Sequence, residues 1–434
     1  ANILTPKYLS RGVNLDVIEV SGGYHHTCAV LDDGRMKCWG YNFHGQLGIN
    51  STDSQTTPQT VDLGTGRTAV SVSAGYYHTC AVLDDGSLKC WGRNYYGELG
   101  IGGTTGSGVQ YTTPQAVDLG TGRTAVSVSV GDYHTCAVLD DGSLKCWGYN
   151  SNGQLGIGST TSQNTPQTVN LGTGRTAVSV GTGQSHTCAV LDDGSLKCWG
   201  QGNLGQLGIG SLTSQTTPQT QTVNLGTGRT AVSVSLGQYH TCAVLDDGSL
   251  KCWGYNSYGQ LGIGSTTQHN TPQTVNFGTG RTAVSVSLGQ YHTCAVLDDG
   301  SSKCWGYGNN YRLGVGYSST NFNTPQTVNN LGTDRTAVSV SAGISHTCAI
   351  LDDDSLKCWG ANWYGQVGTG TGSTVYNPTT VPILFNSPYQ LLGVSNNNSW
   401  FGIPNEVGIF NLDVWYNTSS SSTFHRIRAN VTAP

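Results

Sequence analysis

The chain has 434 residues, of which 62 are glycine and only 10% are charged, and its formal net charge is −5. This composition excludes a coiled coil or a helical bundle, which would need many Glu, Lys, Leu and Ala residues. The net charge favours no nucleic-acid partner, and no run of about 18 apolar residues predicts a membrane span. The chain begins at Ala1 without an apolar leader. We interpret it as a mature secreted chain whose signal peptide has been removed.

The first predicted elements copy the second half of a unit that recurs later. Thr5-Pro6 precedes Gly23 by the same distance as Thr57-Pro58 precedes Gly75. Val17 to Ser21 corresponds to the later run Thr68 to Ser73, whose period of two is typical of a strand. We therefore expect the N-terminal residues to supply strands to a repeated β-structure.

The full unit begins with a predicted hairpin. His26 to Leu31 is a short β-rich run, Asp32-Asp33-Gly34 is a turn, and Lys37-Cys38-Trp39-Gly40 follows. A Gly-Gln-Leu-Gly-like stretch, a Thr-Pro pair and the Thr68 to Ser73 strand complete the unit, which occurs seven times with a period of 52 to 56 residues. About four short strands in about 50 residues is the size of one propeller blade. Closing the blades into a ring removes the exposed edges of an open sheet.

These motifs resemble the regulator of chromosome condensation repeat family, whose pattern is H-T…A-L…D-G…W-G-x-N-x-x-G-Q-L-G. The resemblance covers roughly residues 5–385 and implies a seven-bladed β-propeller. The family includes nuclear exchange factors for small GTPases, ubiquitin-ligase modules and secreted bacterial inhibitors of β-lactamases, so it implies a fold and no single function. The two cysteines of each unit are additions to the family pattern, and residues after about 386 lie outside it.

We predict an all-β fold, a seven-bladed β-propeller with a C-terminal β-hairpin-like extension. Residues 1–20 are expected to be ring-closing strands, 21–386 the propeller and 387–434 the non-repeat extension. Eight Thr-Pro or Asn-Pro pairs accompany only seven cysteine hairpins. We expect residues 5–20 to close the ring by pairing with the last blade, so that Val375 to Phe385 leads out of the ring.

The 14 cysteines occur two per unit and always ten positions apart, which predicts disulfides in an oxidising compartment. A three-residue loop, Asp32-Asp33-Gly34, places Cys28 opposite Cys38, whereas a two-residue loop places Ala29 there. Free or intermolecular thiols and a metal site with His26 as an added ligand are the alternatives, although this spacing is unusual for zinc. The predicted pairs are Cys28–Cys38, Cys80–Cys90, Cys136–Cys146, Cys188–Cys198, Cys242–Cys252, Cys294–Cys304 and Cys348–Cys358.

Other recurring residues are interpreted as structural. One His per unit, such as His26, is expected to hydrogen-bond a neighbouring turn, and the repeated Trp to fill the core. The Asp-Asp-Gly turns lack the oxygen ligands of a calcium loop. The linker arginines, such as Arg67, are expected to be solvated or to pair between blades. We predict no metal and no cofactor.

The positions that vary between units are the candidate binding residues. They lie in the pair before each His and in the loop after each Trp-Gly, and they are rich in Tyr, Asn and Ser, as binding surfaces are. Tyr and Trp rings also stack on sugar faces. The alternative is that they simply fill exposed loops. The candidates are Tyr76, Tyr77, Tyr95, Tyr96, Tyr133, Tyr239, Tyr258, Tyr291, Tyr311, Trp363 and Tyr364.

The segment 387–434 breaks the repeat and contains two predicted strands, 407–416 and 423–431. A lone hairpin is marginal in water, so we expect it to pack on the propeller or on another chain. Asparagines in N-x-[ST] sequons are candidate glycosylation sites of a secreted protein. They are Asn50, Asn397, Asn417 and Asn430.

No catalytic constellation emerges, so we predict that the protein is not an enzyme. The leading hypothesis is a secreted, non-catalytic propeller at the cell surface or outside the cell, acting as a structural or filament subunit or an adhesin. Its expected partners are proteins, including copies of itself, or glycans, contacted through the extension and the variable aromatic loops. The alternative is a monomeric secreted binding protein, either an enzyme inhibitor or lectin-like.

Overall fold

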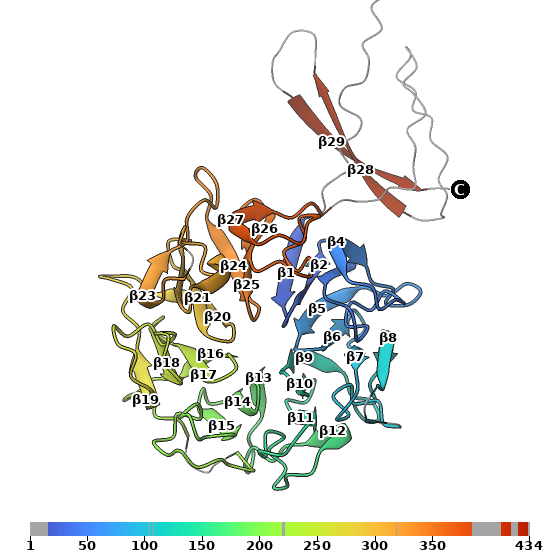
Figure 1. The fold of residues 1–434 in the computed structure, drawn as a ribbon. Coiled ribbons are helices and arrows are strands. Elements are labelled where there is room, and N and C mark those ends of the chain that lie inside the picture. The colour runs from blue at the N-terminus through green and yellow to red at the C-terminus, as the bar shows by residue number, and fades with distance from the viewer. Residues whose placement is uncertain are drawn as a thin grey trace, which may run out of the picture. The chain divides into compact units, whose positions relative to one another are not determined.

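The structure is a computed structural model that describes residues 16–383, apart from 104, 107, 219–221 and 318, and the backbone of 409–417 and 424–432. The chain divides into two compact units, residues 16–382 and residues 1–15 with 383–434. The larger unit contains seven antiparallel sheets around a common axis, which is the predicted seven-bladed propeller (Figure 1). Within the described residues we find no helix of the length and apolarity that crossing a membrane requires.

The strands of each blade run in sequence order from the axis to the rim (Figure 1). Blades 1 to 4 consist of β1 (Val17–Gly22), β2 (His26–Leu31), β3 (Met36–Gly40) and β4 (Gln55–Thr60); β5 (Ala69–Ala74), β6 (His78–Leu83), β7 (Leu88–Arg93) and β8 (Gln110–Ala116); β9 (Ala125–Val130), β10 (His134–Leu139), β11 (Leu144–Gly148) and β12 (Gln163–Thr168); and β13 (Ala177–Thr182), β14 (His186–Leu191) and β15 (Leu196–Gly200). Blades 5 to 7 consist of β16 (Ala231–Leu236), β17 (His240–Leu245), β18 (Leu250–Gly254) and β19 (His269–Thr274); β20 (Ala283–Leu288), β21 (His292–Leu297), β22 (Ser302–Gly306) and β23 (Phe322–Thr327); and β24 (Ala337–Ala342), β25 (His346–Leu351), β26 (Leu356–Gly360) and β27 (Val375–Thr380). The smaller unit contains the antiparallel pair β28 (Ile409–Asn417) and β29 (Phe424–Thr432).

The hairpin between the second and third strands has the three-residue loop that the sequence predicts. Cys28 lies opposite Cys38 in the register of blade 1, and the Gly34 amide donates to the Leu31 carbonyl at 2.8 Å. Gly34 has a φ of 77°, a conformation that glycine adopts without strain. In blade 7 Asp354 takes this position with a φ of 59°, which Asp tolerates better than most residues.

Each of the seven opposed cysteine pairs forms a disulfide, with the two Cα atoms 4.0 to 4.1 Å apart. No cysteine among the described residues is free. In the chain-entropy model, closing a loop of about ten residues stabilises the fold by about 2.5 kcal/mol. Each bridge lies within one blade, so it stabilises its own hairpin and crosses no blade boundary.

The hydrophobic core lies between neighbouring blades. The Cys28–Cys38 disulfide and Leu47 of blade 1 are in one buried cluster with Trp91 of blade 2, and the next blades repeat this arrangement. The Trp91 side chain is 0% exposed. Gly48 must lack a side chain because a Cβ there would lie 2.6 Å from Trp91 Nε1. The Gly-Gln-Leu-Gly stretch therefore packs against the tryptophan of the next blade.

The ring does not close in the way we expected. The part of residues 5–20 that the structure describes belongs to β1, which pairs with β2 of blade 1 and not with blade 7. Val375 to Thr380 forms β27, the rim strand of blade 7, and does not leave the ring. Blades 1 and 7 are instead joined by bonds such as Val17 N to the Asp354 carbonyl, 3.2 Å. Blades 1 and 7 each have four strands within the described residues. Residues 1–15 lie outside the described part.

Six of the eight Thr-Pro or Asn-Pro pairs lie in rim strands, as Pro58 does in β4, whereas Pro6 lies outside the described residues. Proline offers no N–H to a further strand, and prolines on an edge discourage pairing with another chain. Blade 4 differs because two extra residues follow Pro218. Its described rim contact is a single bridge between Gly200 and Gln215.

Candidate functional site

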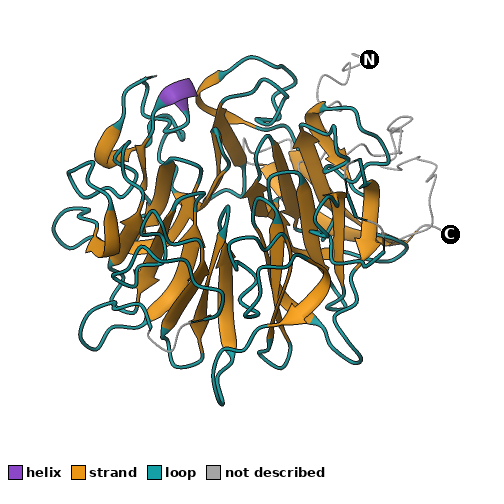
Figure 2. Cartoon of the chain, turned by 60° about the horizontal axis from the view of Figure 1, so that its bottom comes forward, coloured by secondary structure: helices purple, strands orange, loops and turns teal. Residues whose placement is uncertain are grey.

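The propeller has two chemically different ends. Turns from the first to the second strand and loops after the third strand meet at one end, where the Tyr41 amide donates to the His25 carbonyl at 2.8 Å. We call this end the tyrosine face. It includes the short 3-10 helix η1 (Asn309–Tyr311), purple in Figure 2. The Asp-Asp-Gly hairpins and the Gly-Arg-Thr linkers lie at the other end, which we call the aspartate face.

A ring of glycines surrounds the axis near the tyrosine face. A Cβ on Gly23 would lie 2.5 Å from the Gly75 carbonyl oxygen of the next blade, and the same close approach recurs around the ring. Glycine is required here for space and not for a special φ. The ring consists of Gly23, Gly75, Gly131, Gly183, Gly237, Gly289 and Gly343.

Seven histidines link each blade to the next. His26 Nε2 lies 2.9 Å from Thr79 Oγ1, and this hydroxyl donates to the Gln46 carbonyl at 2.9 Å. Trp91 Nε1 donates to the same carbonyl at 2.9 Å. Because the Thr79 hydroxyl already donates its one proton to the Gln46 carbonyl, His26 Nε2 must donate to the hydroxyl oxygen. The pairs are His26–Thr79, His78–Thr135, His134–Thr187, His186–Thr241, His240–Thr293, His292–Thr347 and His346–Thr27.

The same histidines are held neutral. Each ring is 0% exposed, and its Nδ1 has no hydrogen-bond partner among the described residues. Nδ1 of His26 lies close to Gly23, where an added Cβ would be only 2.7 Å from it. Burial lowers the pKa of His26, His134 and His186 to about 3. These imidazoles are therefore structural, although they bond the next blade and not the neighbouring turn that we expected.

An extended aromatic surface covers blades 7, 1, 2 and 3 on the tyrosine face, and we call it the first aromatic arc. Tyr364 lies 4.7 Å from Tyr41, which lies 6.0 Å from Tyr77. Stacking continues from Tyr24 to Tyr76, with centroids 3.7 Å apart. The arc comprises Tyr24, His25, Tyr41, Phe43, His44, Tyr76, Tyr77, Tyr95, Tyr96, Tyr133, Tyr149, Trp363 and Tyr364.

A smaller group on blades 5 and 6 forms the second aromatic arc. Its members are Tyr239, Tyr255, Tyr258, Tyr291 and Tyr307, with neighbouring centroids 4.6 to 6.2 Å apart. Blade 4 has no aromatic residue in the equivalent loops. The predicted candidates thus form two groups, and Tyr311 pairs with Tyr376 of β27 outside both.

The candidates also differ in exposure. Phe43, Trp363, Tyr364 and Tyr95 are exposed, whereas the other predicted tyrosines are half-buried. Sequence reasoning missed the tyrosines directly after Trp-Gly. Tyr41 and Tyr149 belong to the first arc, and Tyr255 and Tyr307 belong to the second. Their position next to the variable loops was the signal that would have revealed them.

Blade 2 carries a charged pair beneath the first arc. Arg93 Nε lies 2.8 Å from Glu98 Oε1, at positions where blade 1 has Tyr41 and Gln46. The guanidinium lies 5.0 Å from the Tyr77 centroid and 4.8 Å from that of Tyr133. Burial raises the pKa of Glu98, and Arg93 opposes this shift.

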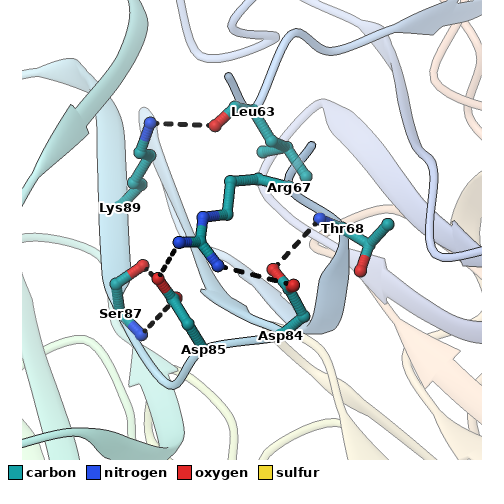
Figure 3. Close-up of polar contacts among 7 residues, drawn as sticks. All are labelled: Leu63, Arg67, Thr68, Asp84, Asp85, Ser87 and Lys89. Carbon is teal, nitrogen blue, oxygen red and sulfur yellow. Dashed lines mark hydrogen bonds and ion pairs between the residues drawn. The ribbon is translucent and has the colours of Figure 1, made fainter. Parts of the chain in front are cut away.

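The aspartate face is made of repeated ion pairs within blades. Arg67 lies 3.5 Å from Asp84 and 2.8 Å from Asp85 (Figure 3). Ser87 donates to Asp85 through its hydroxyl and its amide, which with Arg67 holds the pKa of this carboxyl below its usual value (Figure 3). Each linker arginine pairs with the hairpin of the blade that follows it, and its side chain is 39 to 43% exposed, which agrees with the expected solvated position.

A ring of exposed aliphatic side chains also borders the aspartate face. They occupy the second position of the inner strands, whose beginnings bond to the Asp-Asp-Gly hairpins. Each is 56 to 61% exposed. The ring consists of Ile18, Val70, Val126, Val178, Val232, Val284 and Val338.

The remaining predicted sites are placed as follows. Asn50 is exposed with a φ of 58°, Asn417 and Asn430 lie in β28 and β29, and Asn397 lies outside the described residues. No group of three or more His, Cys, Asp or Glu side chains among residues 16–383, with their gaps, is arranged to hold a metal ion.

Comparison with known proteins places these features in a family. The family model for RCC1-like domains matches residues 107–398, and models for the regulator of chromosome condensation repeat match 17–46, 69–98 and 33–82. The chain is 32% identical to the ultraviolet-B receptor UVR8 of Arabidopsis thaliana over 356 residues, which is 82% of this chain and 79% of that protein. It is 28% identical over 360 residues to the human E3 ubiquitin-protein ligase HERC2, covering 82% of this chain but only 7% of HERC2.

Solved structures show the same fold. Yeast RCC1 (Prp20), crystallised with Kap60, superposes with a TM-score of 0.71 at 19% identity, covering 90% of this chain and 92% of that one. Human WBSCR16 gives a TM-score of 0.70 at 21% identity, covering 78% and 88%. The blade count, the repeated motifs and these matches together show that the chain belongs to the RCC1-like β-propeller family, in a variant with one disulfide in each blade.

Proposed function

We propose that this protein is a non-catalytic binding propeller that acts outside the cell as a structural or assembly subunit or as an adhesin. The observation that carries the proposal is the exposed part of the first aromatic arc. Phe43, Trp363 and Tyr364 are 63%, 54% and 40% exposed. Trp and Tyr dominate the binding energy of many interfaces because they bury large, rigid rings.

Two further observations support the proposal. Seven intramolecular disulfides are typical of proteins that fold and work in an oxidising compartment. Yeast RCC1, which has this fold, was crystallised in a complex with another protein. The paired cysteines keep the loops of the tyrosine face on a stiff scaffold, which lowers the entropy cost of ordering them on binding. In this proposal the C-terminal strand pair supplies the second contact for self-assembly.

A monomeric, lectin-like binding protein is the second candidate. The first aromatic arc favours it because its exposed members carry no charge and present flat rings. Such rings stack on sugar faces, while neighbouring amide and phenol groups hydrogen-bond to hydroxyls. This candidate predicts binding without polymers.

The two candidates separate in one experiment on the full chain. Negative-stain imaging and light scattering of the native protein should show polymers under the first and single particles under the second. Combined Phe43→Ala, Trp363→Ala and Tyr364→Ala should abolish self-association, or binding on a glycan array in the second case. Val126→Ala with Val178→Ala on the aspartate face is the matched control. Equal loss in the control, or no effect of the aromatic variant in either assay, would overturn the role of the arc.

A further inference from the structure

The seven residues that follow the ring glycines differ from one another and surround the axis at the tyrosine face. A cavity of about 80 Å³ lies on the axis, bordered by the glycine ring and by most of these residues. Asp132 is the one carboxylate among them. The full set is Tyr24, Tyr76, Asp132, Gln184, Gln238, Gln290 and Ile344.

A directional chain of hydrogen bonds leads to Asp132. Gln290 Nε2 donates to Gln238 Oε1 at 2.7 Å, and Gln238 Nε2 donates to Asp132 Oδ2 at 2.9 Å. Each glutamine amide donates one of its two N–H groups to this chain. Asp132 Oδ1 accepts no hydrogen bond from any described residue, and Asp132 borders the cavity. The axis therefore presents one carboxylate oxygen that no described residue satisfies.

The charge of Asp132 is poorly compensated by the protein. Its residue is only 9% exposed, and a buried carboxylate with one neutral donor is costly unless a positive charge offsets it. Burial raises its pKa to about 7, and Gln238 and Arg93 lower it only in part. Arg93 is held by Glu98 at 2.8 Å. Tyr133 and Tyr239 also face Asp132 and bring no positive charge.

We infer that the axial cavity binds a small cation beside Asp132 Oδ1. The free carboxylate oxygen and the amide oxygens of Gln238 and Gln290 are oxygen acceptors of the kind that hard cations prefer. Alkali and alkaline-earth ions and primary ammonium groups share this chemistry. A cation here would bridge blades 3, 5 and 6 across the axis and stabilise the ring.

The test measures the melting temperature of the full chain at constant pH in calcium, sodium, potassium and ammonium chlorides. Choline chloride at equal ionic strength is the reference, because a quaternary ammonium has no N–H to donate and no bare charge for oxygen ligands to coordinate. We expect at least one ion to raise the melting temperature in proportion to the logarithm of its concentration, because binding only to the folded state stabilises it. A response to ammonium alone identifies an amine as the ligand, and a response to a metal identifies an inorganic ion.

Two carboxylate variants complete the test. Asp132→Asn should lose the ion-specific rise, whereas Asp140→Asn, which removes a carboxylate from the aspartate face, should keep it. The inference is overturned when no ion exceeds choline, or when Asp132→Asn responds like the unchanged protein. Neither outcome bears on the binding role of the first aromatic arc, because that role is tested by measuring self-association and glycan binding.

Discussion

Acid should unfold this protein steeply, because seven buried imidazoles must stay neutral in the folded state. Burial lowers the pKa of His26, His134, His186, His240 and His346 to about 3 and that of His78 and His292 well below its usual value. The unfolded chain has the ordinary histidine pKa of about 6.5. Below that pH the unfolded state binds more protons, so stability present above pH 6.5 is lost as the pH falls.

The size of the effect follows from the same values. Lowering the pH from 7 to 5 costs about 13 kcal/mol for the seven histidines together, or roughly 2 kcal/mol for each one. Glu19 and Asp132, whose pKa values burial raises to about 7, bind protons in the folded state and act in the opposite direction by about 4 kcal/mol together. The expected net loss from these nine groups is about 9 kcal/mol, and the steepest slope between pH 7 and 5 corresponds to about five protons.

Guanidinium unfolding at a series of pH values, with the disulfides intact, measures this slope. His186→Gln, which keeps a donor for Thr241, should lower the slope by about one proton. Gln273→Asn on the rim strand β19 changes no titratable group, so it is the control and should leave the slope unchanged. A slope below about two protons for the unchanged chain, or an equal effect of the two variants, would refute the neutral histidine ring.

Three further predictions concern the fold. Gly75→Ala should destabilise the propeller by several kcal/mol, about the cost of overpacking, because the added Cβ would clash with the Gly131 carbonyl. Gly372→Ala is the control and should be tolerated, because a Cβ there would lie no closer than 3.6 Å to any neighbouring atom. Equal melting temperatures of the two variants would contradict the spatial role of the glycine ring. Glu98→Gln should lower the free energy of unfolding by about 3 kcal/mol, because it leaves Arg93 without its partner. The double variant Glu98→Gln with Arg93→Tyr has the residue pair of blade 1, so chemical unfolding should show that most of this loss is recovered. A double variant as unstable as the single one would disprove the coupling. All fourteen cysteines are 0 to 1% exposed, so thiol labelling under reductant should stay low until denaturant is added, and rapid labelling of the native protein would show that the blades open.

The sequence alone determined the blade and its covalent bonds, because these depend on short separations. Cys28 and Cys38 are ten positions apart around a three-residue loop, so local turn geometry is sufficient to predict their pairing. Sevenfold repetition of the motif then made the count of blades unambiguous. The same reasoning identified the variable tyrosine loops, since they are the positions at which the repeats differ.

Tertiary structure decided every feature that depends on contact between blades. Tyr364 and Tyr41 are more than 300 positions apart in the chain, so their place in one arc appears only when blades 7 and 1 meet. Arg67 reaches Asp84 in the hairpin of the blade that follows its linker, and β1 pairs with β2 within blade 1. Asp132 is one variable loop residue among many in the sequence, and only the convergence of seven turns on the axis places its carboxylate against Gln238 at the axial cavity.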